Sequence, residues 1–596
     1  GGLTSKTGPN GHMTTYGYDA YNRTNSIADP DGGSTSIGYL SPTETETQTT
    51  INSGGTLTAY SFNDGFGRQI YAQTADGDTT ETVYGTMGRV AGISNPYSTG
   101  TPPGAGSQFT RTTYDGLGRP TSVTAVDGGK ATYSYTANAT RITDPRGVQK
   151  IVEYGGFGHV WRVCEVSGQS GNGPCGLPIG GSGFLTTYAY DMVGRLTQAS
   201  QVAQTRTWTY DTPGRVLTSD QPESGTTTYT YDSVSNSACS STSGGSLVFI
   251  QNAAGNSVCL TYDQWNRVTE KALSTGQTYT YAYDGGTANG LGRLTGATGP
   301  ADGMTFGYDK MGRTATVTET NGGVGPYTTT YAYNYLGEPP SVTAPTGRVF
   351  DYGYDPDARM DQIQDGSTST TYLGSVAYNA ADEVTSAEFG GNALTMSVSY
   401  NNTLQPFQVS YSPSGGGGVT LQFDWGATVN ASGDVTSDDN DGTLRQMVDV
   451  TNSSLSMTYT YDDMNRLYSA VESNNTINVS LSVDQYGNRD SESGTLSEPF
   501  ASSATNNQIA SSGFTYDAAG RMTAGSWAGV SRTMAWDALN QLTAYTDGNQ
   551  GTTSYSYDPF GRRIEAVNGS TSGVAITPRS WPAGCRPIPL VWPRSA

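Results

Sequence analysis

Residues 186–215 read TTYAYDMVGRLTQASQVAQTRTWTYDTPGR, and this stretch contains the unit Tyr-Asp-x-x-Gly-Arg twice, at 190–195 and 210–215. The aspartate of the unit can accept hydrogen bonds from backbone N–H groups, and the glycine supplies the positive φ that closes a short hairpin loop. An aromatic residue two positions before the tyrosine, Tyr188 or Trp208, lies on the same face of a strand as that tyrosine. The stretch therefore predicts two β-hairpins in succession.

The same unit recurs along nearly the whole chain, so internal repetition is the dominant signal in the sequence. Six copies are complete, and their turn residues are Tyr114, Asp115, Gly118 and Arg119; Tyr190, Asp191, Gly194 and Arg195; Tyr210, Asp211, Gly214 and Arg215; Tyr308, Asp309, Gly312 and Arg313; Tyr516, Asp517, Gly520 and Arg521; and Tyr557, Asp558, Gly561 and Arg562. Degenerate copies begin at Tyr18, Asn63, Tyr84, Tyr154, Tyr231, Tyr262, Tyr333, Tyr354, Tyr378, Tyr461, Val483 and Trp536, and a copy beginning at Tyr283 is stretched by an insertion before Gly292.

The repeat length decides the architecture. After the glycine, each copy continues with arginine and an alternation rich in Leu, Val and Thr, as in residues 195–197, which is typical of a return strand. No apolar period of 3.6 residues persists, so helices are not expected. Nineteen copies predict roughly 38 strands, or ~180 Å of sheet at ~4.8 Å per strand. Because open twisted sheets rarely exceed ~10 strands without curling, we expect an all-β strip of tandem hairpins that winds into a superhelix or shell.

Two kinds of contact are expected between stacked hairpins. Stacking in register places Tyr over Tyr in ladders, and each aromatic pair contributes ~0.5–1.5 kcal/mol beyond its buried area. The Asp and Arg of the turn can pair across neighbouring hairpins. At an exposed rim such a pair contributes ~0–1 kcal/mol, so it sets the register more than the stability.

Composition fits a protein without a large dry core. A chain of 596 residues suggests about four ordinary domains, but only 34% of the residues are hydrophobic, 14% are charged, and 40 Tyr outnumber 14 Phe. The net charge of −21 disfavours nucleic acid and anionic lipid as partners, because both are bound by clustered Lys and Arg. No run approaches the ~18–20 apolar residues of a membrane span. The start, Gly1-Gly2-Leu3-Thr4, is neither a Met start nor a signal peptide, which predicts a fragment or a processed chain.

The five cysteines allow two local disulfides in an oxidising compartment. Cys164 and Cys175 flank a Gly-rich turn, and Cys239 and Cys259 bracket another connection. The alternative is four buried or unreactive thiols. Spacing alone leaves both open, because it does not show whether the Cα atoms approach within ~7 Å.

The repeated unit resembles the YD repeats of RHS proteins, a group that includes bacterial polymorphic toxins, components of insecticidal toxin complexes, wall-associated proteins and animal teneurins. Residues 94–97 (SNPY) and 112–123 (TTYDGLGRPTSV) are especially similar to bacterial RHS chains, and the likeness runs from about Tyr16 to Asn568. The resemblance implies a β-strip spiralling into a hollow shell which, in toxin members, encloses a C-terminal effector. It also implies a secreted or cell-surface bacterial protein whose partner is an enclosed effector polypeptide.

The resemblance divides the chain into three parts: a partial or disordered start at 1–15, a repeat shell at 16–571 with divergent hairpins at 384–456, and a non-repeat tail at 572–596. The tail is rich in Pro, Arg and Trp and is interpreted as a truncated or frameshifted end, or as a short linker. Toxin members end the shell with paired Asp residues that release the effector by self-cleavage. Residues 355–357 and 558–561 contain Asp-Pro, but they are repeat turns by context, and we do not assign them that role.

The sequence offers no constellation for catalysis or for a cofactor. His12 and His159 are the two histidines, and His159 occupies the Arg position of a repeat copy, which favours a structural role. The acidic run around Asp439 and Asp441 suggests a weak Ca²⁺ site, but the 12-residue loop that would centre on Gly442 lacks the final Glu, so a solvated turn is favoured. We expect no enzyme activity and no cofactor in the repeats.

Two non-catalytic functions follow from the sequence. The first is a structural shell fragment that encapsulates and presents an effector polypeptide absent from this chain. The second is a secreted or cell-surface module that contacts glycans or proteins of other cells through exposed Tyr ladders. The Tyr rows are expected to face one another within the strip, which favours the shell. Any enzymatic activity of a longer protein would lie in a C-terminal segment.

Overall fold

The computed structural model describes residues 2–52, 55–98, 108–169, 173–286, 288–495, 501–569 and 574–575. The predicted all-β class is confirmed: apart from one short 3-10 turn, η1 (Ser453–Leu455), the described residues form strands and loops. Among them there is no helix long and apolar enough to cross a membrane.

Two sheets contain the strands. The main sheet has 42 strands, which are β1 (Ser5–Thr7), β2 (Met13–Tyr18), β3 (Thr24–Ala28), β4 (Ser34–Ser41), β5 (Glu44–Asn52), β6 (Gly55–Asn63), β7 (Gln69–Thr74), β8 (Thr79–Tyr84), β9 (Val90–Ser94), β10 (Phe109–Tyr114), β11 (Pro120–Thr124), β12 (Lys130–Thr136), β13 (Ala139–Thr143), β14 (Gln149–Tyr154), β15 (Val160–Val166), β16 (Gly173–Pro174), β17 (Ser182–Tyr190), β18 (Leu196–Gln201), β19 (Gln204–Tyr210), β20 (Val216–Gln221), β21 (Gly225–Ser235), β22 (Ser240–Gln251), β23 (Ser257–Tyr262), β24 (Val268–Leu273), β25 (Thr278–Tyr283), β26 (Leu294–Thr298), β27 (Asp302–Tyr308), β28 (Thr314–Asn321), β29 (Val324–Tyr331), β30 (Ser341–Thr343), β31 (Val349–Tyr354), β32 (Met360–Asp365), β33 (Thr371–Tyr378), β34 (Val384–Phe389), β35 (Leu394–Tyr400), β36 (Pro406–Pro413), β37 (Val419–Asp424), β38 (Gln446–Asp449), β39 (Met457–Tyr461), β40 (Leu467–Glu472), β41 (Asn478–Val483) and β42 (Arg489–Gly494). The second sheet has seven strands, which are β43 (Thr515–Tyr516), β44 (Met522–Trp527), β45 (Val530–Trp536), β46 (Leu542–Asp547), β47 (Gly551–Tyr557), β48 (Arg563–Asn568) and β49 (Val574–Ala575).

The topology is a continuous antiparallel meander. Each strand pairs with its neighbours in sequence, as β17 with β18 and β19 with β20. The exception is the two-residue β16, which pairs beside β15 on the edge of β17. Each hairpin therefore has two ends: the turn with the Tyr-Asp-x-x-Gly-Arg unit, here called the YD turn, and the turn to the next hairpin, here called the linking turn. All YD turns lie along one rim of the strip and all linking turns along the other.

A β-bulge at most YD turns contributes to the curl of the strip. In the hairpin of β17 and β18, the register shifts between Ala189 and Tyr190, and Gly194 has φ +88°. The same shift occurs at the tyrosine of the other complete copies. A bulge bends its strand and increases the local twist. Bulges that recur at the same rim bend the strip repeatedly in the same direction.

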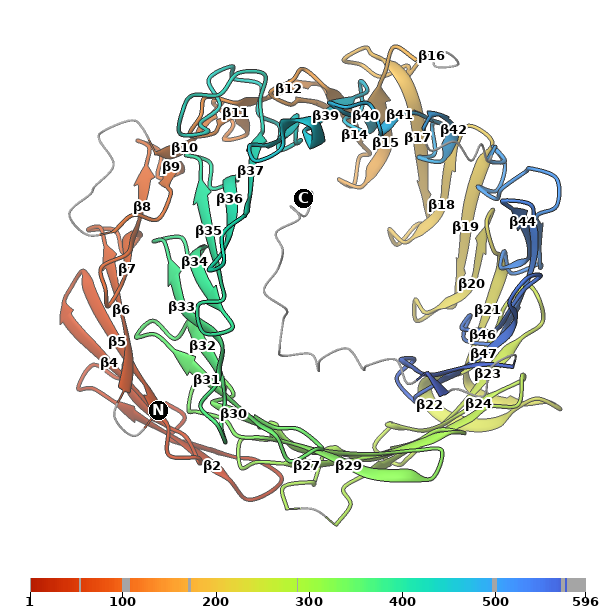
Figure 1. The fold of residues 1–596 in the computed structure, drawn as a ribbon, viewed down its shortest axis with the longest axis horizontal. Helices are drawn as coiled ribbons and strands as arrows, with labels where there is room; N and C mark the ends of the chain where they lie inside the picture. The colour runs from red at the N-terminus through yellow and green to blue at the C-terminus, as the bar shows by residue number, and fades with distance from the viewer. Residues whose placement is uncertain are drawn as a thin grey trace.

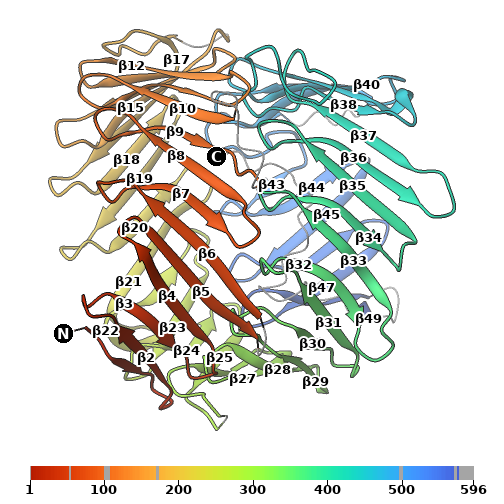
Figure 2. The same cartoon turned by 90° about the vertical axis from the view of Figure 1, so that its left-hand side faces the viewer.

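The strip winds into a spiral of about two turns, which Figure 1 shows as a ring in the view down the short axis. Asn10 lies against Leu291, 281 residues later in the chain, so one turn takes about that length. Figure 2 shows the two turns side by side, the first in red to yellow and the second in green to blue. The second turn begins near the YD turn between β25 and β26 and continues through the seven-stranded sheet.

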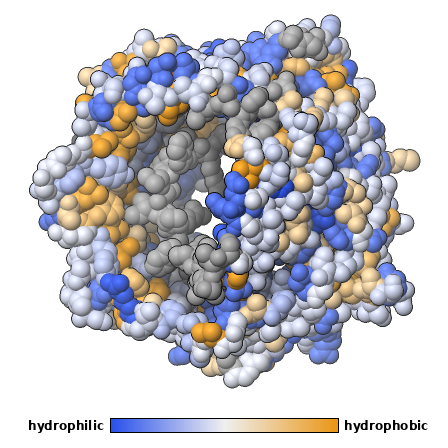
Figure 3. Space-filling view, turned by 45° about the vertical axis from the view of Figure 1, so that its right-hand side comes forward, coloured by the Kyte–Doolittle hydropathy of each residue, from blue (hydrophilic) through white to orange (hydrophobic). Residues whose placement is uncertain are grey.

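The wall has small local clusters of buried side chains in place of one central core. One contains Ile151, Cys164, Cys175 and neighbours under the long linking segment after β15, and another contains Leu373 with Val376 and strands β33 to β36. In the space-filling view the middle of the molecule is hollowed between the walls (Figure 3). The low apolar content of the sequence matches this arrangement.

The strip covers more of the start than the sequence predicts. β1 pairs with β2, so the strip begins within residues 1–15, which were expected to be partial or disordered. Residues 384–456 continue the meander from β34 to β38, with a long YD-side excursion that includes a bridge between Val429 and Val435. Of the predicted tail at 572–596, only β49 is described, and the rest lies outside the described residues.

Candidate functional site

Each residue of the YD turn has a defined contact. In the copy at 190–195, Asp191 Oδ1 accepts hydrogen bonds from the backbone N–H groups of Val193 and Arg195, at 3.0 and 2.9 Å. Asp191 Oδ2 accepts from Arg195 Nε at 2.6 Å, and the N–H of Gly194 donates to the Asp191 carbonyl. The Arg195 backbone hydrogen bond, the Arg195 side chain and the Val193 N–H together lower the pKa of Asp191. The Asp191–Arg195 pair therefore carries no net charge, and its side chains hold the turn in its conformation.

In most copies that have it, the arginine of the YD turn reaches forward to the next hairpin. Arg195 Nη1 donates to the Asp211 carbonyl at 2.8 Å, and its guanidinium lies over the Tyr210 ring at 5.0 Å. The same stacking of Arg on the next tyrosine occurs in the pairs Arg23/Tyr39, Arg68/Tyr84, Arg119/Tyr135, Arg215/Tyr231, Arg267/Tyr283, Arg313/Tyr333 and Arg359/Tyr378. Such cation–π contacts contribute ~0.5–1 kcal/mol each at exposed sites.

The tyrosine hydroxyl reaches back to the preceding hairpin. Tyr210 donates to the Leu196 carbonyl at 2.7 Å, and Tyr557 donates to the Leu542 carbonyl at 2.8 Å. In the degenerate copy that begins with tryptophan, Trp536 Nε1 donates to the Met522 carbonyl at 2.8 Å. Phe has no such donor, which explains why the repeat uses Tyr so much more than Phe.

The structure corrects one expectation about stacking, the Tyr ladder, and bears out the other, the pairing of Asp and Arg across neighbouring hairpins. The ladder is one of Arg on Tyr rather than Tyr on Tyr, because the long guanidinium bridges the distance between neighbouring hairpins. The Asp–Arg pair forms first within its own turn, as between Arg313 and Asp309. Pairing across neighbouring hairpins occurs in addition, for example between Arg215 and Asp232 at 2.8 Å.

The two turns of the spiral meet along a line of contact, here called the seam. At the seam, the linking turns in the first turn of the spiral lie against the YD turns in its second turn. Arg313 pairs with Asp31 at 3.1 Å, and the Tyr335 N–H donates to the Ile51 carbonyl at 2.9 Å. Further contacts join Asn95 to Asn402, Asp127 to Asn440, Asp144 to Asn465, Ala203 to Tyr486, Glu223 to Gln508 and Tyr281 to Pro559. Sequence separations across the seam run from 243 to 321 residues.

An acidic cluster lies in this seam, where the linking turn after β7 meets the YD turn after β31. Arg359 lies within 4 Å of five carboxylates, those of Asp76, Asp78, Asp355, Asp357 and Asp382. Burial and a hydrogen bond with Asp76 raise the pKa of Asp357 to about 7. The hydrogen bond from Asp357 in turn lowers the pKa of Asp76. The pair therefore shares a proton in the folded chain.

Replacing Asp357 with asparagine is expected to flatten the pH dependence of the seam. An unfolded Asp loses its proton near pH ~4, whereas the folded pair keeps it to about pH 7. The stability that the shared proton supplies is thus full below pH ~4 and is lost as the pH rises through the folded pKa. Asp357→Asn cannot ionise but can still donate to Asp76. Its gain in melting temperature over wild type should be small at pH 5 and larger at pH 8.

The control for this measurement is Asp220→Asn, which removes a carboxylate that bonds Thr226 outside the seam. A gain by Asp357→Asn that is equal at the two pH values, or a matching gain by the control, would contradict the shared proton.

The candidate binding site is a gap in the Arg–Tyr ladder between β15 and β17. The copy at 154–159 has Gly155 in place of Asp and His159 in place of Arg. The His159 ring stacks on Tyr190 at 4.9 Å between centroids, in the position that a guanidinium takes elsewhere. The shorter side chain leaves a groove of about 610 Å³ between the two YD turns.

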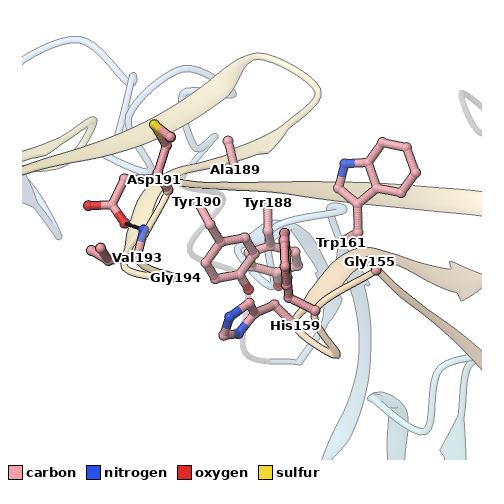
Figure 4. A pocket seen from close by; sticks show the side chains of 12 residues that line it. Gly155, His159, Trp161, Tyr188, Ala189, Tyr190, Asp191, Val193 and Gly194 are labelled. Atoms are coloured by element: carbon pink, nitrogen blue, oxygen red, sulfur yellow. Dashed lines mark hydrogen bonds between the residues drawn. The ribbon is translucent and has the colours of Figure 1, made fainter.

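Aromatic side chains line this groove (Figure 4). The rings of Tyr188, Tyr190 and His159 lie together, and Trp161 lies across from them on the neighbouring strand. Trp161 is half exposed, and Phe157 at the tip of the turn is exposed almost completely. Flat rings that are open to solvent on one face suit stacking on a sugar ring or on an apolar side chain. The site offers recognition, and within the groove no nucleophile is paired with a base.

Completing the motif in this copy is expected to close the groove and stabilise the strip. The double variant Gly155→Asp, His159→Arg restores the carboxylate and the guanidinium of the complete turn. Gly155 has room for a Cβ, whose nearest neighbour is the His159 carbonyl at 3.8 Å. We expect a gain of ~1 kcal/mol, from one cation–π contact and the turn hydrogen bonds. The urea midpoint of the double variant, compared with each single variant, measures it, and a double variant no more stable than both singles would contradict the ladder.

The structure places the other sequence-predicted residues as follows. It links Cys164 to Cys175 and Cys239 to Cys259, with Cα atoms 6.0 and 5.4 Å apart, and Cys585 lies outside the described residues. His12 contributes to the seam, with Nε2 2.6 Å from Asn289 Oδ1.

The two residues of the suggested Ca²⁺ site face different partners. Asp439 accepts from the Ala427 N–H, whereas Asp441 pairs with Arg146 at 3.4 Å. Within the part of the chain that the structure describes, no three acidic, Cys or His side chains gather as a metal ion requires.

Comparison with known families identifies the repeat. The profile of the RHS Repeat family matches residues 1–34 and 536–572, at the two ends of the strip, and the same YD turn and Arg–Tyr ladder run between them. The chain therefore carries RHS repeats at both of these ends. The family assignment made from the YD units is thereby confirmed.

Solved structures share the fold of the RHS strip. The crystal structure of TcdB2-TccC3 aligns with a TM-score of 0.74 and 15% identity, over 95% of this chain and 36% of that one. The Photorhabdus luminescens Tc holotoxin pore with the TccC3-D651A mutation aligns with a TM-score of 0.72 and 16% identity, over 88% of this chain and 30% of that one. At such identities the likeness establishes the fold.

A curated relative matches a shorter part. The double-stranded DNA deaminase toxin A of Burkholderia cenocepacia (strain H111) is 30% identical over 122 residues, which are 19% of this chain and 8% of the relative. The RHS strip thus spans about a third of the solved chains that it matches and a small part of this relative.

Proposed function

We propose that the strip is the wall of a shell that encloses and presents a polypeptide, and that the repeats perform no chemistry themselves. The observation that carries this is the seam. It joins the two turns of the spiral rim to rim around a hollow centre, by ion pairs and hydrogen bonds repeated from Asn10 to Arg562 (Figures 1 and 3). A wall held in this way excludes proteases and solvent-borne macromolecules from what lies inside.

The comparisons support the same role. One solved structure with this fold is named as a Tc holotoxin pore, and the sequence relative is named as a toxin. In our proposal the enclosed partner is an effector polypeptide carried by a longer form of the protein, which is secreted by a bacterium or held at its surface. Catalysis, where it occurs, belongs to that effector.

Protection from proteolysis tests the proposal. An unfolded, protease-sensitive reporter peptide is fused after Ala596, and its cleavage is followed at fixed protease concentration. We expect cleavage at least tenfold slower than for the same reporter on an unrelated folded carrier. The matched control is Arg313→Ala with Arg359→Ala, which breaks ion pairs of the seam. Equal cleavage on the shell and on the unrelated carrier would overturn the proposal.

The groove at His159 supports a second candidate function, that of a binding module. Its open Tyr, Trp and His rings suit a glycan or an apolar side chain at a cell surface. A glycan array probed with the chain and with Trp161→Ala separates the two functions. Binding that is lost in the variant supports the module, and an array without signal leaves the shell as the better account.

A further inference from the structure

One hairpin of the strip carries aromatic rings on the face where the complete YD copies carry small residues. In those six copies, the residue before the tyrosine is Thr, Ser, Gly or Ala. One of them, Ala189, points away from the Tyr190 ring in Figure 4. The copy at 63–68 has Phe62 at this position, and Tyr71 lies opposite it in the hairpin. Its rings therefore lie on the face opposite to that of the repeat tyrosines.

These two rings belong to a row that has a glutamate at each end. Across strands β5 to β8, the directly opposed residues are Glu44, Phe62, Tyr71 and Glu81, in that order. Directly opposed residues of an antiparallel sheet share a face, with Cβ atoms ~4.5–5.5 Å apart. The Phe62 and Tyr71 rings meet edge to face, with centroids 6.4 Å apart. The row therefore presents two rings between two carboxylates.

A second row extends the first on the same face. Tyr60 lies two residues before Phe62, and the two rings stack with centroids 6.5 Å apart. The Tyr60 hydroxyl donates to the Glu46 carboxylate, and this hydrogen bond is the main reason why the pKa of Tyr60 is raised. The six residues of the two rows are all partly exposed. They are here called the aromatic–acidic patch: Glu44, Glu46, Tyr60, Phe62, Tyr71 and Glu81.

The patch has no positive charge of its own. Residues 24–88 contain eight Asp and Glu but a single basic residue, Arg68. Arg68 is held in its own YD turn, 2.6 Å from Asp64, and its guanidinium lies over the Tyr84 ring. Within the described part of the chain, none of the three glutamates of the patch forms an ion pair. The rings and carboxylates of the patch therefore lack a cation.

The YD turns show which cation this combination of groups binds. Arg195, for example, lies between the Asp191 carboxylate and the Tyr210 ring. A planar guanidinium can stack on a ring and bond a carboxylate at the same time, which a compact lysine ammonium does less well. The patch offers the same two groups side by side. Its chemistry therefore suits an arginine that another polypeptide supplies.

We propose that the aromatic–acidic patch is a docking surface for an arginine-bearing segment of a partner polypeptide. A guanidinium stacks on the Phe62 or Tyr71 ring and bonds the glutamate at that end of the row. A further arginine of the same segment reaches Glu46 beside the Tyr60 ring. The net charge of −21 attracts such a segment from a distance. The proposal goes beyond the shell, because it depends on this hairpin and not on an enclosed cargo.

Binding of a labelled peptide tests the proposal. The probe is a short peptide in which Gly-Ser pairs separate the arginines, and fluorescence anisotropy at physiological ionic strength follows its binding to the full chain. The comparison peptide has citrulline in place of arginine, which keeps the planar group and removes the charge. We expect the citrulline peptide to bind at least about tenfold more weakly.

Two variants separate the contribution of the rings from that of the charges. The ring variant, Phe62→Thr with Tyr71→Thr, introduces the threonine pair that the copy at 210–215 has and leaves every charge in place. The charge variant is Glu44→Gln with Glu81→Gln. We expect each variant to weaken binding of the arginine peptide about tenfold.

The matched control is Glu270→Gln with Glu388→Gln, which removes the same charge from partly exposed positions of β24 and β34. It should bind the arginine peptide as tightly as the wild type does. Circular dichroism and melting temperature verify the fold of all three variants. An arginine peptide that does not bind would overturn the proposal. So would a ring variant that binds like wild type, or a control that loses as much as the charge variant, because either result would reduce the binding to general charge attraction.

Discussion

Replacing Asp558 with alanine is expected to lower the free energy of unfolding by about 3 kcal/mol, because it leaves two backbone N–H groups without an acceptor in a buried turn. Asp558 is 1% exposed. Its Oδ1 accepts from the N–H groups of Phe560 and Arg562, and its Oδ2 accepts from Arg562 Nε. Water has less access to these groups than in other YD turns, because Asp558 and Pro559 are buried and Tyr281 of the first turn of the spiral donates to the Pro559 carbonyl. Urea denaturation followed by tryptophan fluorescence measures the loss.

The matched control is Asp115→Ala, at the same position of a YD turn in the first turn of the spiral. Asp115 makes the same set of hydrogen bonds, but its side chain is 22% exposed and that of Arg119 is 42% exposed. Solvent can reach the groups left behind, so the loss should be clearly smaller. Equal losses at the two positions would mean that the seam does not shield the turns beneath it.

Removing the disulfide between Cys164 and Cys175 is expected to have an effect of similar size. The bridge closes a span of 11 residues, and a link of this length contributes ~3 kcal/mol by restricting the unfolded chain. Both sulfur atoms lie in a buried cluster with Ile151 and Leu177. The double variant Cys164→Ala, Cys175→Ala should therefore also release the linking segment that covers this cluster.

Unfolding with and without reductant measures the contribution of the bridge. Reductant breaks both disulfides of the wild type but only the bridge that remains in a double variant. A parallel variant without the second bridge, Cys239→Ala with Cys259→Ala, therefore separates the two contributions. A wild type whose midpoint is unchanged by reductant would show that neither bridge contributes.

The hairpins could be predicted from the sequence because their causes are local. Gly194 and Asp191 lie within five residues of each other, and the turn that they form depends on little else. The role of the tyrosine hydroxyl was missed, although the sequence contains a signal for it. Trp536 replaces Tyr in one copy, and what the two side chains share is a polar N–H or O–H at the end of a large ring.

The seam could not be predicted, because it depends on the sum of many small bends. Which linking turn meets which YD turn is set by curvature accumulated over about 281 residues, and a change of one hairpin in the circumference would shift every pair. The groove lies between these cases. Gly155 and His159 mark it in the sequence as a copy that lacks both charged groups, but the space it opens requires the neighbouring turn at Tyr190.

The seam also changes how this wall comes apart. A strip whose hairpins touch only their neighbours unfolds piecewise, since the loss of one unit costs only two contacts. Here each hairpin of the second turn also rests on one of the first, such as Tyr486 on Ala203 and Asn465 on Asp144. When a hairpin loses its contacts along the strip, its contacts across the seam still hold it in place. Cleavage of a single loop should therefore leave the wall folded.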